Sequence, residues 1–139
     1  MKSLLSVTAA VILLGACVST NASLIDPTVR FARTCPEGIK LYTTPDRVSQ
    51  PYREVALLNA KGESNWSDEE DMIESMRDKA AEIGANGIIL SGIDEPSALT
   101  KVIGQVAKTG SQRKGKALAI YVPSDSTNTA TACANAEKK

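Results

Sequence analysis

Residues Ser67–Leu90, SDEEDMIESMRDKAAEIGANGIIL, decide the fold class, because they contain a helix, a stop for that helix and a buried strand. Ser67 with Glu70 three residues later has the spacing of a capping box, and the acidic run here suits the positive end of a helix dipole. Apolar residues then recur at helical spacing, namely Met72, Ile73, Met76, Ala80 and Ile83. Gly84 is a natural C-terminal stop. We therefore predict a long amphipathic helix over 68–83 with one apolar face.

The segments around this helix have the pattern of strands. The run GIILS at 87–91 follows the helix directly and is apolar enough for a buried strand. Upstream, Ile39 and Leu41 alternate with polar neighbours, as in a half-buried strand. The nearly continuous apolar run at 54–58 suits a central strand.

A further strand is predicted near the C-terminus, at 117–122, ALAIYV. The segment 97–107 has both helical spacing and strand-forming residues, so its assignment stays open between the two. We favour a strand there, joined to the last strand by a hairpin loop, KTGSQRKGK, at 108–116. The pattern as a whole predicts an α+β fold: a small sheet of four to five strands with one long amphipathic helix packed on one face.

The chain begins with a segment typical of protein export. Lys2 precedes an apolar stretch at 4–14, which is shorter than the roughly 20 residues that span a bilayer. The stretch ends in Leu-Gly-Ala-Cys, which resembles the bacterial lipobox. This predicts that residues 1–16 are a removed signal peptide and that Cys17 is acylated and holds the protein on the membrane. The alternative is an ordinary secreted protein with a chance cysteine at this position.

Composition divides the rest of the chain into three parts. Residues 17–34 mix small polar and apolar side chains without periodicity, and we interpret them as a lipidated flexible tether. Residues 124–139 are rich in Ser, Thr, Ala and Asn, which is typical of a disordered tail. The folded domain is therefore predicted at 35–123. Val18, rather than aspartate, after the lipobox cysteine favours the outer membrane, by resemblance to enterobacterial lipoproteins.

Two cysteines remain once Cys17 is assigned to the lipid. In an oxidising compartment a disulfide between Cys35 and Cys133 is favoured over leaving two free thiols. It would close a loop of nearly 100 residues and fasten the tail to the start of the domain. Intermolecular pairing and free thiols stay open as alternatives.

The composition argues against several classes of function. The chain has 16 basic and 16 acidic side chains, so no net charge attracts nucleic acid or an anionic membrane. It has no histidine, the side chain most often used as a general base or zinc ligand near neutral pH. No metal cluster or phosphate-binding loop is visible, so we expect no cofactor and no catalytic residues. A histidine-free hydrolase that uses carboxylates brought together by the fold is the rival class.

One group of charged residues is a candidate for binding. Lys108, Arg113, Lys114 and Lys116 lie close together in the predicted hairpin loop. They would suit an acidic partner, a phosphate-bearing headgroup or the carboxylates of peptidoglycan, although a solvated hairpin tip has the same composition.

Three stretches resemble a family of small bacterial envelope lipoproteins with RcsF-like signalling domains: PYREVALLNA at 51–60, KAAEIGANGIIL at 79–90 and GKALAIYV at 115–122. The resemblance implies an α+β envelope domain with a binding, structural or stress-sensing role. We therefore expect a lipid-anchored, non-catalytic protein whose partners are the membrane and, in one reading, another envelope protein. A structural subunit of an envelope assembly is the alternative, and the oligomeric state stays open.

Overall fold

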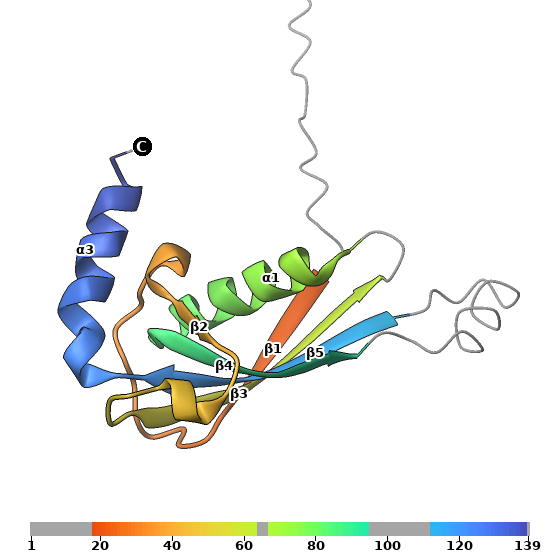
Figure 1. Ribbon diagram of the computed structural model, residues 1–139, viewed down its shortest axis with the longest axis horizontal. Helices are drawn as coiled ribbons and strands as arrows, with labels where there is room; N and C mark the ends of the chain where they lie inside the picture. Colours follow the sequence, from red (N-terminus) through yellow and green to blue (C-terminus); the bar gives the residue numbers. More distant parts are fainter. Residues whose placement is uncertain (1–17, 64–66, 95–111, 139) are drawn as a thin grey trace, which may run out of the picture.

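The computed structural model describes residues 18–63, 67–94 and 112–138 (Figure 1). They form a five-stranded sheet with a helix across one face and a second helix beside one end. The elements in chain order are β1 Val18–Leu24, η1 Pro36–Gly38, β2 Lys40–Tyr42, η2 Pro45–Arg47, β3 Arg53–Glu63, α1 Glu69–Glu82, β4 Gly87–Asp94, β5 Gln112–Tyr121, η3 Pro123–Asp125 and α3 Ser126–Ala136.

The sheet is mixed, with strand order β1-β3-β5-β4-β2. The pairs β1–β3, β3–β5 and β5–β4 are antiparallel, and β2 runs parallel to β4. The long strand β5 therefore lies at the centre, and β1 and β2 are the edges. The predicted α+β class is confirmed, with a second helix in addition to the one expected.

Helix α1 packs on the sheet through the face that its sequence predicts. Met72, Met76 and Ala80 are fully buried between helix and sheet. The helix ends where Gly84 adopts a φ of 82°, a conformation that favours glycine. The predicted stop is therefore confirmed.

The capping box begins one residue later than predicted. Asp68 is the N-cap: its side chain accepts a hydrogen bond from the Asp71 amide at 2.9 Å, and Asp71 accepts one from the Asp68 amide at 3.0 Å. Ser67 does not cap, because its hydroxyl donates to the Glu63 carbonyl at 2.6 Å and its amide donates to the same oxygen. The serine therefore closes the turn that leads into the helix, and Glu70 lies in the first turn without a capping role.

The predicted disordered tail, 124–139, is wrong for the residues that the structure describes. Pro123–Asp125 forms a short 3-10 helix and Ser126–Ala136 forms α3. Alanine has the highest helix propensity and recurs along this segment, while the disulfide at Cys133 holds the helix against η1. Thr129 is buried at that contact.

The predicted flexible tether, 17–34, is also wrong from Val18 onward. Val18–Leu24 pairs with β3 over its full length, and Thr20 is buried with its hydroxyl 2.7 Å from that of Ser75. The following segment packs on the domain as well, since the Thr34 hydroxyl donates to the Ala85 carbonyl at 2.7 Å. The folded domain therefore begins at Val18 and not at Cys35.

The strands at one end of the sheet are longer than expected. β3 continues to Glu63, β4 to Asp94, and β5 begins at Gln112, so residues 112–116 are strand and not a hairpin loop. The strand β5 continues from its apolar centre through this polar segment because its backbone pairs with β3 on one side and β4 on the other. The segment 97–107, which the sequence leaves open between helix and strand, lies outside the described residues. Within the described ranges, no helix is long and apolar enough to cross a bilayer.

Candidate binding surfaces

Cys35 and Cys133 form a disulfide, as predicted, and this excludes free thiols and intermolecular pairing for these two residues in this structure. Cys35 precedes η1 directly, and Cys133 lies in α3. The bond therefore joins the C-terminal helix to the segment that leads into edge strand β2. A structural disulfide of this kind is typical of an oxidising, extracytoplasmic compartment.

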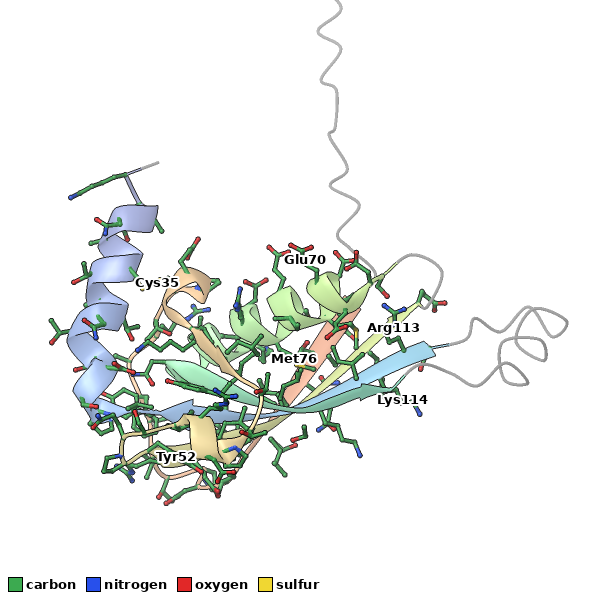
Figure 2. The ribbon with its side chains drawn as sticks, in the orientation of Figure 1. Cys35, Tyr52, Glu70, Met76, Arg113 and Lys114 are labelled. Carbon is green, nitrogen blue, oxygen red and sulfur yellow. A yellow bond between two sulfur atoms is a disulfide. The ribbon has the colours of Figure 1, made fainter. Side chains whose placement is uncertain are left out.

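The predicted basic group is divided by the sheet. Lys108 lies outside the described residues, and the other three lie in β5, where successive side chains point to opposite faces. Figure 2 shows Arg113 on the side covered by α1 and Lys114 on the other side. Arg113 donates to the Ser67 carbonyl at 3.0 Å and so supports the turn before α1. The expectation that Arg113 joins the lysines in one loop is wrong, because the segment is a strand.

Lys114 and Lys116 instead share their face with Lys61 of β3. Lys61 pairs in register with Lys114, and Asn59 pairs with Lys116. Directly opposed side chains in antiparallel strands have Cβ atoms about 4.5–5.5 Å apart, so the first pair brings two like charges together. We call Lys61, Lys114, Lys116, Asn59 and the neighbouring Leu57 the lysine face.

The lysine face is open to solvent. All three lysines are exposed, and Leu57 keeps 53% of its surface accessible. Among the described side chains, Lys40 forms an ion pair with Asp125 and Lys79 forms one with Glu82, and neither pair involves this face. At its border, the backbone of Asp94 pairs with Lys114. The sequence-based prediction did not include Lys61. Its charged side chain alternates with the small residues Ala60 and Gly62, and this pattern indicates a strand that continues past the apolar run.

The other half of this side of the sheet is covered. The segment around η2 brings Tyr42, Val48 and Tyr52 over a small apolar cluster of Ile89, Ile120 and Val122. Figure 2 shows Tyr52 on this side, away from α1. Within the described part of the chain, no element covers the lysine face, which lies at the end of the sheet where β1 begins and β3 ends.

The side that carries α1 has the opposite charge. A groove of 610 Å³ lies between α1 and the η1–β2 segment, with side chains from Pro36, Glu37, Leu41, Glu69, Glu70, Ile73, Glu74 and Arg77. Within the described part of the chain, the buried Nε atom of Arg77 has no hydrogen-bond partner. Four glutamates around one arginine make this groove acidic.

A second cleft, of 460 Å³, lies between α3 and the segment before η1. Its walls are mainly small or apolar, with Phe31, Thr34, Tyr121, Thr129, Ala130 and Cys133 among the lining residues. Asn86 also lines this cleft, and its side-chain amide is already hydrogen-bonded to Val122. Across the described ranges, no group of three or more His, Cys, Asp or Glu side chains is placed to hold a metal ion.

The fold and the disulfide define a small disulfide-bonded α+β domain. No protein-family model matches the chain, and no curated protein matches it in sequence. Among solved structures, it is similar to the crystal structure of a Francisella virulence factor, FvfA, in its orthorhombic form. The match has 13% sequence identity and a TM-score of 0.50, and covers 73% of this chain and 96% of that one. At this identity, the similarity concerns the fold.

Proposed function

We propose that this protein is a bacterial envelope lipoprotein, held on the membrane by acyl chains on Cys17, whose extracytoplasmic domain is a binding module and not an enzyme. The disulfide carries the proposal. The chain has three cysteines, and two of them are joined to each other, so Cys17 is the cysteine left over for acylation. Its position after an apolar stretch that ends in Leu-Gly-Ala suits that role.

A binding role is supported by the chemistry of the interior. Catalytic acids and bases are commonly buried groups with shifted pKa values. The buried polar residues of the described chain are Thr20, Ser67, Asn86 and Thr129, and none of them is an acid or a base near neutral pH. Ser67 donates its hydroxyl to a backbone carbonyl and is not poised as a nucleophile. Exposed charged surfaces, basic on one side and acidic on the other, suit recognition.

The test is the intact mass of the protein purified from native membranes, measured before and after reduction. We expect a chain that starts at Cys17, carries a diacylglyceryl group and gains the mass of a pair of hydrogens on reduction. A Cys17→Ser variant should lose the acyl groups, whereas a Cys35→Ser/Cys133→Ser variant should keep them. A mature chain without acyl groups would refute the lipoprotein assignment.

A structural subunit of an envelope assembly is the second candidate, and one observation favours it. β1 is a seven-residue edge strand, and no described element pairs with its outer side. Such an edge is a template for strand addition by another chain. The mass of the detergent-solubilised protein checks this: a defined oligomer or hetero-complex supports a subunit, and a monomer argues against it.

A further inference from the structure

The first observation is that no linker separates Cys17 from the folded domain. Val18 is the first residue of β1 and pairs in register with Gly62 of β3. Consecutive Cα atoms are about 3.8 Å apart, so a lipid on Cys17 would be attached at the end of the sheet itself. A flexible tether of the kind expected from the sequence would have let the domain move far from the bilayer. The direct connection from Cys17 to Val18 instead keeps the domain close to the bilayer.

The second observation is that the lysine face lies at the same end of the sheet. Ser19, two residues after Cys17, pairs with Lys61, and Lys61 pairs with Lys114. Neighbouring strands are about 4.8 Å apart, which places the Lys114 backbone within about 10 Å of Ser19. Whatever surface holds Cys17 is therefore within reach of these lysines.

The third observation is a charge difference across the sheet at this end. On the α1 side, the side chain of Val18 lines a hollow together with Asp71, Glu74, Ser75 and Asp78. On the other side lie the three exposed lysines of the lysine face, which outnumber the one acidic residue of β3 there, Glu63. An anionic surface next to Cys17 would therefore repel the α1 side and attract the lysine face.

We propose that the lysine face rests on anionic phospholipid headgroups of the membrane that holds Cys17, so that the domain is fixed in one orientation with α1 directed away from the bilayer. The inference depends on the proposed lipoprotein function. It explains why two lysines are tolerated as direct cross-strand neighbours, since headgroup phosphates would neutralise both. The exposed Leu57 side chain lies on the same face, where it can contact the apolar edge of the headgroup layer.

The test measures lysine reactivity in the native acylated protein. The protein is reconstituted into vesicles of phosphatidylcholine alone, or with about one-third phosphatidylglycerol, and treated with a membrane-impermeant acetylating reagent. Mass spectrometry then gives the labelling rate of each lysine. In anionic vesicles, we expect labelling of Lys61, Lys114 and Lys116 to slow about five-fold or more, while the exposed Lys138 on the C-terminal segment changes less than about two-fold. About 1 M salt, where the Debye length is about 3 Å, should remove the protection.

A pair of matched variants tests the charge requirement. In Lys114→Gln/Lys116→Gln, Lys61 remains as a reporter and should lose its protection. In Arg30→Gln/Arg33→Gln, which removes the same charge from exposed positions outside the face, Lys61 should stay protected. Loss of protection in both variants would overturn the assignment to this face.

The outcomes separate this inference from the proposed function. The intact mass of the same sample is read first, and the absence of acyl groups would refute both. If the acyl groups are present but the three lysines label equally in both vesicles, the orientation alone is overturned. Protection in native membranes but not in anionic vesicles would instead identify an acidic protein as the partner and overturn the lipid contact.

Discussion

Asn86 binds Val122 through both polar atoms of its side chain. Nδ2 donates to the Val122 carbonyl at 2.8 Å, and Oδ1 accepts from the Val122 amide at 2.7 Å. Both residues are almost completely buried. The Asn86 backbone also accepts from the Lys40 amide and donates to the Ile120 carbonyl, both at 3.1 Å. One residue in the turn after α1 therefore joins β2 to the end of β5.

Asn86→Ala should lower the free energy of unfolding by about 2–4 kcal/mol, because it leaves a buried amide and a buried carbonyl without partners. Urea unfolding followed by circular dichroism measures the change. Asn135→Ala, an exposed position on α3, is the control and should stay within about 0.5 kcal/mol of the wild type. Equal effects of the two substitutions would contradict the structural role of Asn86.

Gly84→Ala should be more destabilising than Gly92→Ala. Both glycines have positive φ, 82° and 143°, so alanine is strained at each. A methyl group at Gly84 would also approach Cβ of Phe31 to 2.5 Å, whereas nothing lies within 4 Å of one at Gly92. We expect a cost of about 1 kcal/mol at Gly92 and about 3 kcal/mol at Gly84 in the same urea experiment. Similar losses of unfolding free energy for the two variants would mean that the segment at Phe31 moves to make room for the methyl group.

Loss of the disulfide should release α3. The bond spans a sequence separation of 98 residues, for which the chain-entropy model gives at most about 4–5 kcal/mol. Cys35→Ser/Cys133→Ser should lower the free energy of unfolding by up to that amount and speed amide exchange across 126–136. Reduced wild type is the matched control and should behave like the variant. Retained protection of α3 would show that its packing on η1 suffices.

The ion pair between Lys40 and Asp125 should stabilise the fold only above strongly acidic pH. Nζ of Lys40 lies 2.7 Å from Oδ2 of Asp125, and this hydrogen bond is the main cause that lowers the pKa of Asp125 below its usual 3.8. A carboxyl with a lowered folded-state pKa contributes full stability above its unfolded-state pKa and loses it as the pH falls through the folded-state pKa. The Lys40 side chain is 49% exposed, so the contribution is below about 1 kcal/mol.

Asp125→Asn should therefore weaken the dependence of stability on pH below about 4. Urea unfolding of wild type and variant across that range gives the comparison. The pH dependence of the free energy of unfolding that remains in the variant would come from other carboxyls with lowered pKa, such as those of Asp26 and Glu82. If wild type and variant show the same pH dependence of the free energy of unfolding, the ion pair does not form in solution.

The parts of the fold that the sequence predicts are those with a dense apolar pattern. Helix α1, its stop at Gly84 and strand β4 follow from periodicity, because Met72, Met76 and Ile88 must be buried together. β1 and α3 lack such a pattern. The first is held by pairing with β3 and by the contact of Thr20 with Ser75, and the second by the disulfide. These stabilising contacts join residues far apart in the chain, so local composition does not reveal them.

The same reason limits what the sequence says about the lysine face. Lys114 and Lys116 are close in sequence, so the sequence predicts a basic group there, although it places that group in a loop and not in a strand. Lys61 lies far from them in the chain and joins them only through the register of β3 with β5. Arg113 leaves the group because strand alternation turns it to the α1 side.

The bond between Cys35 and Cys133 also determines how the chain responds to proteolysis. It closes a covalent ring that contains α1 and the strands β2, β3, β4 and β5. A single backbone cut between the two cysteines opens the ring without producing two molecules. A nicked domain would therefore remain one covalent unit, still joined to β1 and to any lipid on Cys17. Shedding a fragment of the ring into the surroundings would require reduction of the disulfide or a second cut.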